Sequence, residues 1–291
     1  MTQEQVNQIH EVFLFIMDDI HRVCVANNLK YYLFAGSALG AVRHKGFIPW
    51  DPDLDIAMPR KDYELFVTHY SNELKDLLYC SDYRKDKTHK SSHAIVFLKD
   101  SSLLSLPMIR NNIRHQFFVD ILPLDQVPDD DELKRKHEKD LNKVFSLMRR
   151  KYRLRRKDDT PVKDFIKPFA AFILDIFTPS LYKLHIIQQE IAQRFKDLPE
   201  SECPYLCCTS LSKYEYSKFC VSREIWGNPV LMSFEGRNYY VPQDVDKYLT
   251  HLFGDYLKVP DKEEQKKCLN HWVYAEWIDL EGNKRIIDER K

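Results

Sequence analysis

Three aspartates stand at alternate positions in IPWDPDLDIAM, residues 48–58: Asp51, Asp53 and Asp55. Side chains alternate between the two faces of a strand, so Asp53 and Asp55 are expected on one face of a strand DLDIAM. Carboxylates held this close repel each other unless a cation lies between them, and hard oxygen ligands suit Mg²⁺ together with substrate phosphates. The pair therefore predicts a magnesium site that acts on phosphate groups, with Mn²⁺ as an alternative ion.

Pro52 separates Asp51 from this pair. Because proline has no N–H to give to a sheet, it belongs at the entry of a strand. We therefore predict that the strand begins at Asp53 and that Asp51 lies outside the metal site, in a turn or cap. The alternative is that Asp53 and Asp55 only face solvent on an edge strand.

Two further features favour the metal site. Asp120 interrupts the apolar stretch FFVDIL, where an acid must be paired or bind a metal. In FAGSALG, a strand that ends at Gly36 precedes a short helix with Ser37 as N-cap, and such a helix start offers N–H groups and a hydroxyl to a phosphate. Together these features match the nucleotidyltransferase-fold pattern, with Asp53, Asp55 and Asp120 as both the catalytic and the metal-binding residues.

The order of the elements predicts an α+β fold, a nucleotidyltransferase-like mixed sheet flanked by helices. Residues 1–130 are expected to form the catalytic core, and residues 201–291 to complete it. Residues 131–200 read as a helical insertion or subdomain. Strands are expected at 94–98, 102–109 and 116–122, a turn at 123–131, a hairpin around Gly236 and a helix that ends near Gly254.

Length and composition exclude several classes of protein. The chain has 291 residues, and its 44 Lys and Arg balance its 44 Asp and Glu, so no nucleic-acid partner is expected. The first helix does not resemble a signal peptide, and every apolar run is too short or too interrupted to span a membrane. A cytoplasmic location is therefore expected. The seven cysteines fit reduced thiols, although a zinc site among Cys203, Cys207, Cys208 and Cys220 is the alternative.

A basic run, RRKYRLRRK at 149–157, precedes an apolar segment at 165–187. One interpretation is a peripheral contact with anionic lipid at the inner face of the plasma membrane, with the basic run on head groups and Phe165, Phe169, Phe172, Ile173 and Phe177 in the interface. The other interpretation is a core helix beside a solvated charged helix. The sequence leaves both open.

Three blocks of the sequence resemble one family, the LicD phosphotransferases, which also contain the fukutin-like enzymes. They are FAGSALGAVRHKGFIPWDPDLDIAMPRKDYELF, FFVDILPLDQVPDD and YYVPQDVDKYLTHLFGDYLKVP. One departure is Pro52, where many members carry a further aspartate. Since the expected metal ligands are Asp53 and Asp55, activity should survive this change.

The resemblance implies transfer of phosphocholine or an alditol phosphate from a CDP-linked donor to a sugar hydroxyl of a cell-surface glycan, such as lipopolysaccharide or teichoic acid. The alternatives are a nucleotidyltransferase that acts on a small molecule or protein, and an inactive relative that binds nucleotide or glycan. The side chains expected to contact substrate are those near the helix start, cations after it and nearby aromatic rings: Gly36, Ser37, Arg43, His44, Lys45 and Trp50, with Tyr239 and Tyr240 as further candidates for stacking.

Overall fold

The computed structural model describes residues 1–51, 53–111, 113, 115–155, 161–211, 216–268, 272–279 and 281–290. Its helices are α1 Gln3–Ala26, α2 Ala35–His44, α3 Arg60–Thr68, α4 Leu106–Arg110, α5 Asp131–Leu154, α6 Pro161–Phe177, α7 Leu181–Ala192, α8 Tyr216–Phe219, α9 Arg223–Trp226, α10 Val245–Phe253 and α11 Lys262–Cys268. Its strands are β1 Tyr32–Leu33, β2 Asp55–Pro59, β3 Leu78–Ser81, β4 Ala94–Leu98, β5 Ser102–Ser105, β6 Phe118–Val127, β7 Tyr205–Cys208, β8 Cys220–Ser222, β9 Val230–Phe234, β10 Arg237–Val241, β11 Trp272–Ile278 and β12 Lys284–Asp288.

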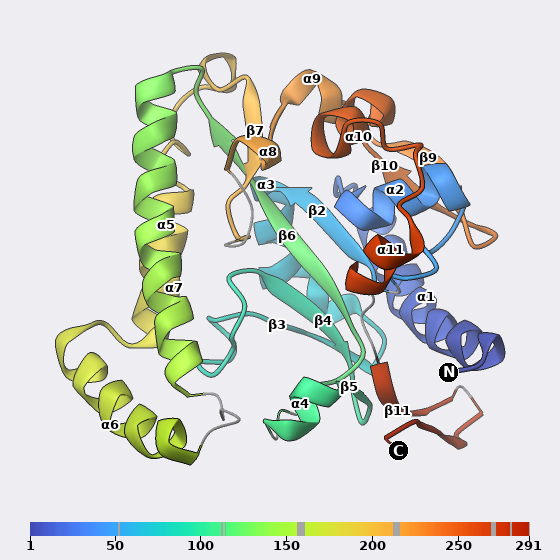
Figure 1. The fold of residues 1–291 in the computed structure, drawn as a ribbon. Coiled ribbons are helices and arrows are strands. Elements are labelled where there is room, and N and C mark those ends of the chain that lie inside the picture. The colour runs from blue at the N-terminus through green and yellow to red at the C-terminus, as the bar shows by residue number, and fades with distance from the viewer. Residues whose placement is uncertain are drawn as a thin grey trace.

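A curled mixed sheet forms the centre of the molecule (Figure 1). Its strands run in the order β1-β2-β6-β4-β3, and β7 and β8 extend it from the second half of β6. β2 and β6 are parallel, and Asp55 is the register partner of Asp120. A hairpin of β9 and β10 and a three-stranded sheet of β12, β11 and β5 lie outside the main sheet. The predicted mixed sheet flanked by helices is thus confirmed.

Helix α1 shows how the sequence builds the core. Thr2 and Gln5 form a capping box at its start, which satisfies N–H groups that a helix leaves free. Its apolar side chains recur on one face, and this face packs against β4 and β6. On the other side of the molecule, β6 and β2 contact α3. The amphipathic helix predicted at the start of the chain is confirmed.

Several predicted boundaries are wrong. The predicted N-cap is Ser37, but the helix begins at Ala35 with Phe34 as N-cap, because Ser37 is buried and points back to β2. The strand predicted to begin at Asp53 begins at Asp55, where ladder pairing with β6 starts. Strand β6 continues through the predicted turn to Val127, because its second half pairs with β7.

Further elements differ in extent. The strand predicted at 102–109 ends at Ser105 and gives way to α4. The strand at 94–98 and the hairpin around Gly236 are confirmed, and Gly236 has the positive φ of +73° that the turn requires. Helix α10 ends with Gly254 as its C-cap, as predicted.

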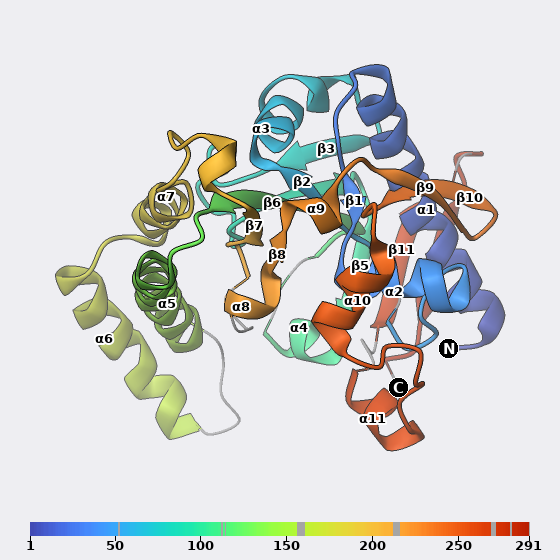
Figure 2. The ribbon, with the colours of Figure 1, turned by 90° about the horizontal axis from the view of Figure 1, so that it is seen from above.

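Helices α5 and α7 lie beside the sheet and share a small apolar cluster of their own, and α6 lies outermost (Figures 1 and 2). The members of this cluster are Leu141, Val144, Phe145, Met148 and Leu184. The division at 131 and 200 remains an interpretation. Among the described residues no single helix is both long and apolar enough to cross a membrane, although α6 and α7, bent by 52°, pass such a test together by length and composition alone.

Candidate active site

A cavity of about 760 Å³ gathers residues from both ends of the chain around four aspartates. Its walls come from the start of α2, the segment before β2, β6, α8 and the segment that follows α10. The lining residues are Phe34, Ala35, Gly36, Leu39, Arg43, Ile48, Trp50, Asp51, Asp53, Asp55, Asp120, Leu122, Leu211, Lys218, Phe219, Leu252, Phe253, Asp255, Tyr256, Lys258 and Pro260. The cavity thus contains the acids that the sequence singled out.

Asp55 and Asp120 lie side by side on the parallel strands β2 and β6. Register partners place their side chains on the same face of a sheet, so the two carboxyl groups meet and share a hydrogen bond. Burial, reinforced by the charges of Asp53, Asp120 and Asp51, raises the pKa of Asp55 well above its usual value. This shift favours the protonated form of Asp55, which reduces the repulsion between the two groups.

Asp53 and Asp51 form a second hydrogen-bonded pair of carboxyl groups. Burial is the main cause that raises the pKa of both, and for Asp53 the charges of Asp51 and Asp120 add to it. Asp51 was predicted to lie outside the metal site, but in the structure it lines the same cavity as the other three acids. Although it stands outside β2, as expected, an N–H to O=C bond to Ile48 folds the chain back and brings its carboxylate beside Asp53.

Gly36 is required where Asp51 approaches the start of α2. A Cβ atom at Gly36 would lie 2.8 Å from the Asp51 carboxylate, closer than real contacts of this kind. The residue before it, Ala35, has a φ of +41°, and its N–H donates to the Tyr248 hydroxyl. The predicted phosphate-binding segment therefore lies directly against the acids.

The four acids fit a divalent cation by their chemistry. Carboxylate oxygens are the ligands that Mg²⁺ prefers, and the crowding of Asp51, Asp53, Asp55 and Asp120 calls for positive charge. In the part of the chain that the structure describes, however, no group of three or more His, Cys, Asp or Glu side chains is arranged to hold a metal ion as it stands. At this site burial and the neighbouring carboxylates instead favour the protonated forms of Asp53 and Asp55.

The other predicted substrate residues divide into two groups. Arg43 and Trp50 line the cavity, with the guanidinium 5.7 Å from the Trp50 ring centre. Arg43 also donates to the Tyr256 carbonyl at 3.0 Å, and burial lowers its pKa. His44 and Lys45 do not line the cavity: His44 accepts a hydrogen bond from Arg43, and Lys45 is the left-handed C-cap of α2.

Ser37 has a different role from the one predicted. Its hydroxyl oxygen accepts a 2.9 Å hydrogen bond from the Asp55 N–H. This bond fixes the first residue of β2 and thereby the position of its carboxylate. Ser37 thus acts at the site by positioning Asp55.

Sequence reasoning missed His93, whose Nε2 lies 3.1 Å from the Asp120 carboxylate. His93 stands in a polar loop before β4, and it reaches Asp120 because β4 pairs with β6. Lys218 and Lys258, which line the same cavity, were missed as well. Their positions in the chain carry no local pattern, so only the folded arrangement identifies them.

Comparisons with known proteins agree with this geometry. Residues 28–145 match a family model described as LicD/FKTN/FKRP, nucleotidyltransferase domain. This segment of the chain therefore resembles the LicD-type nucleotidyltransferase domain. The similarity extends further along the chain, because lipopolysaccharide cholinephosphotransferase LicD of Haemophilus influenzae is 28% identical over 88% of this chain and 92% of its own length.

Two other relatives are uncharacterized proteins. RP689 of Rickettsia prowazekii is 33% identical over 36% of this chain and 41% of its own length. RT0683 of Rickettsia typhi is 42% identical over 22% of this chain and 20% of its own length. The family resemblance stated from the sequence is therefore confirmed.

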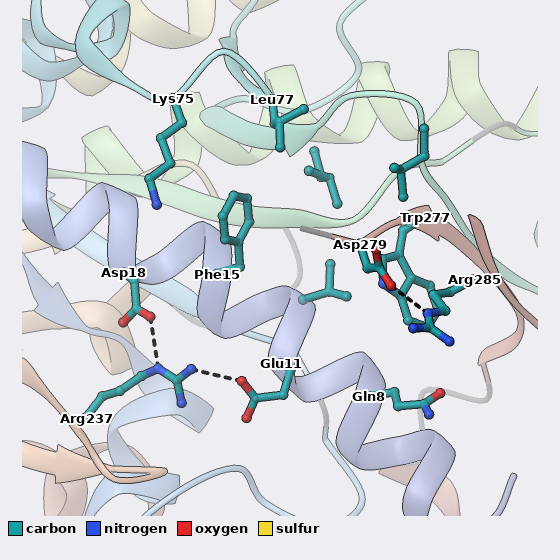
Figure 3. A pocket seen from close by; sticks show the side chains of 13 residues that line it. Gln8, Glu11, Phe15, Asp18, Lys75, Leu77, Arg237, Trp277, Asp279 and Arg285 are labelled. Carbon is teal, nitrogen blue, oxygen red and sulfur yellow. Dashed lines mark hydrogen bonds and ion pairs between the residues drawn. The ribbon is translucent and has the colours of Figure 1, made fainter. Parts of the chain in front are cut away.

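A second cavity, of about 560 Å³, lies between α1 and β11, and it lacks the chemistry of the LicD-type site (Figure 3). Its acidic and basic side chains neutralise each other: Arg237 bonds both Asp18 and Glu11, and Asp279 bonds Arg285. The acids of the first cavity instead face one another. The first cavity is therefore the candidate active site.

Two earlier candidates lie elsewhere. Tyr239 is buried and donates its hydroxyl proton to Asp18, and Tyr240 packs on Tyr31, so neither ring lines the active-site cavity. The zinc alternative gains no support, since the described cysteines belong to no metal-binding group. Cys207 and Cys220 are register partners across β7 and β8, where burial raises the pKa of Cys207.

Proposed function

We propose that this chain is a metal-dependent phosphotransferase that moves a phosphorylated alcohol, foremost phosphocholine, from a CDP-linked donor to a sugar hydroxyl of a cell-surface glycan. The observation that carries the proposal is the crowding of four aspartates in one cavity of a LicD-type domain. The similarity to a lipopolysaccharide cholinephosphotransferase along most of the chain supports phosphocholine and a glycan acceptor.

In this proposal Asp53, Asp55 and Asp120 hold Mg²⁺ or Mn²⁺, and Asp51 adds a fourth carboxylate. A divalent cation bound there supplies the positive charge that neutralises the donor diphosphate and the leaving nucleotide. Because burial raises the pKa of Asp53 and Asp55, a cation held there would compete with protons for these carboxylates.

The start of α2 is the proposed phosphate contact. The N–H groups of Ala35 and Ser37 already donate to the Tyr248 hydroxyl and the Phe34 carbonyl, so the proposed donor is the Gly36 N–H, at the helix end where the dipole favours negative charge. Gly36 lets the Asp51 carboxylate approach this helix start, where a Cβ atom would lie 2.8 Å from it. Lys218 and Lys258, which also line the cavity, add positive charge near the donor.

Asp120 is the proposed general base. It accepts the proton of the acceptor hydroxyl while the hydroxyl oxygen forms a bond to phosphorus, and the bond from phosphorus to the CMP oxygen breaks. The products are CMP and the phosphodiester-linked glycan. His93 lies against Asp120 and holds its carboxylate in place.

Trp50 is the proposed contact for the alcohol. Its ring lies at the cavity wall, and an aromatic face attracts a quaternary ammonium such as that of choline. Arg43 already stands over this ring and ties the Tyr256 segment to α2. Its main role is therefore to close the wall of the cavity.

The test is incubation of the protein with Mg²⁺, a panel of CDP-alcohols and candidate glycans, followed by mass analysis of the products. We expect CMP release from CDP-choline and a glycan heavier by one phosphocholine, and neither product from Asp55→Asn. A product that carries the nucleotide would establish the nucleotidyltransferase alternative. Mg²⁺-dependent binding of every donor without turnover would establish an inactive relative.

A further inference from the structure

Helix α6 presents an apolar surface to solvent, which we call the α6 stripe. Phe177 is 80% exposed and Phe169 is 69% exposed, whereas Ala171 on the opposite side is buried. The stripe consists of Ile166, Phe169, Phe172, Ile173, Ile176 and Phe177. These positions recur every three or four residues, so their side chains share one face of the helix. A contiguous apolar surface of this size marks a contact with a partner or a lipid surface.

The neighbouring helix α5 is strongly basic next to this stripe. Residues 141–155 contain basic side chains and no Asp or Glu. Lys151 and Arg155 are used inside the protein, because both pair with Asp175 of α6 and so join the two helices. Arg149, Arg150 and Arg153 are exposed on α5.

These three arginines border a hollow to which Lys90 also contributes. The hollow lies between α5 and the loop before β4, and the Tyr152 hydroxyl donates to the Lys90 carbonyl and holds the two together. The residues that line the hollow carry positive charge or are neutral. Its chemistry therefore fits phosphate-bearing groups.

We propose that α5 and α6 dock the protein on an anionic lipid bilayer, with the α6 stripe in the interfacial region and Lys90, Arg149, Arg150 and Arg153 on lipid phosphates. Amphipathic helices bind bilayers in this way, with the apolar face in the interface and basic residues on anionic head groups. Helices α5 and α6 lie together at one side of the molecule, away from the sheet of β12, β11 and β5 (Figures 1 and 2).

Charge complementarity favours a bilayer over a second copy of the chain. A second copy that met the stripe would bring its own residues 141–155 to the contact, and these are basic in both copies. An anionic surface instead supplies the negative charge that the hollow requires. The same loop that gives Lys90 to the hollow ends at His93, beside Asp120, so the docking surface and the proposed active site are connected by three residues of chain.

The test is co-sedimentation of the purified full-length protein with vesicles of phosphatidylglycerol and phosphatidylcholine at low salt. We expect binding to mixed vesicles, little binding to pure phosphatidylcholine, and release as salt rises through about 0.15 M, where the Debye length is about 8 Å. Two triple variants divide the contributions. Phe169→Ser, Phe172→Ser and Phe177→Ser remove the apolar part, and Arg149→Gln, Arg150→Gln and Arg153→Gln remove the basic part.

The arginine variant should lose on the order of 10²-fold in vesicle partition, since each basic residue near anionic lipid contributes roughly a fivefold factor. The phenylalanine variant should lose at least about tenfold in vesicle partition, and its remaining binding should depend on charge alone. The control for the phenylalanine variant combines Val230→Ser, Leu231→Ser and Leu257→Ser, which are exposed apolar residues elsewhere on the protein. The control for the arginine variant combines Lys61→Gln, Lys196→Gln and Lys262→Gln, which are exposed basic residues elsewhere. Both controls should bind as the wild type does.

Wild-type protein that ignores anionic vesicles at low salt, or a control that loses as much binding as its matched variant, would overturn the proposal. Light scattering without vesicles tests the second copy. A wild-type dimer that the phenylalanine variant converts to a monomer, with vesicle binding unchanged, would assign the stripe to self-association. CMP release from a soluble donor is measured in parallel and judges the proposed activity separately.

Discussion

Two acids on strand β6 have opposite surroundings. Asp125 faces α3, where Arg60 meets it with two hydrogen bonds of 2.6 and 2.7 Å. Asp120, five positions earlier and therefore on the other face, meets Asp55 and lies among carboxyl groups. An acid that stabilises the fold is neutralised by the chain itself. The acids of the cavity instead face other carboxyl groups, and this difference is the reason why we propose that a cation binds there.

The largest expected effect concerns the structural acid. Asp125→Asn removes the carboxylate that Arg60 meets with two hydrogen bonds and leaves only Glu64 as its charge partner, and breaking a buried pair destabilises a fold by about 3 kcal/mol. Urea denaturation should show this loss in the free energy of unfolding. The protein should still gain stability when Mg²⁺ is added, because the cavity is unchanged. Equal stability of the variant and the wild type would contradict the role assigned to Arg60.

The next effect concerns the cavity. Asp55→Asn should reduce CMP release by on the order of 10², because positioned charge in phosphoryl transfer is lost. Stability in urea without metal should be retained, and the stabilisation by Mg²⁺ should disappear. Asp120→Asn should behave in the same way. Near-normal turnover of either variant at ordinary Mg²⁺ concentrations would remove these acids from the mechanism.

Asp51 sharpens the comparison, because it joins the cavity from outside β2. From the sequence alone, Asp51→Asn is expected to cost less than tenfold. Its hydrogen bond to Asp53 raises this expectation to about tenfold, or about 1.4 kcal/mol, in kcat/KM. Gly36→Ala should give a similar loss, since its methyl group displaces the Asp51 carboxylate. Full activity of both variants would return Asp51 to the role of a turn residue.

The smallest expected effect is on how the free energy of unfolding changes with pH. The pKa values of Asp53 and Asp55 are raised by burial and neighbouring carboxylates, so above about pH 4 the folded chain holds more protons than the unfolded chain. The free energy of unfolding of the metal-free protein should therefore fall as pH rises through that window. Asp53→Asn should flatten this decline, and the two proteins should converge below about pH 4. An equally steep decline in the wild type and in Asp53→Asn would show that repulsion at Asp53 does not cause the pH dependence.

The sequence predicted Asp53, Asp55 and Asp120 because their signals are local. Parity along one strand and an acid within an apolar run are visible in any window of a few residues. Asp51 was misplaced because its approach depends on a backbone bond to Ile48 and on the missing side chain of Gly36. His93 was missed because only the pairing of β4 with β6 brings it to Asp120.

The same division holds for the fold. Helix α1 and the β9–β10 hairpin were predicted, since periodicity and a turn glycine specify them locally. Strands β7 and β8 were missed, because Cys207 and its neighbours are a short segment that becomes a strand only beside β6. The length of β6 was underestimated for the same reason. Pairing between distant segments supplied what the local pattern lacked.

The cavity wall from Lys218 to Pro260 lies outside residues 28–145, the segment that matches the family model. The hydroxyl of Tyr248 even accepts the N–H of Ala35, at the start of α2. Residues 28–145 therefore do not form the cavity on their own. A chimera in which only this segment is exchanged between relatives would combine the aspartates of one protein with the Lys218–Pro260 part of the cavity wall of the other. Donor preference in such chimeras should depend on both segments, because Trp50 lies in the matched segment and Lys218 and Lys258 lie outside it.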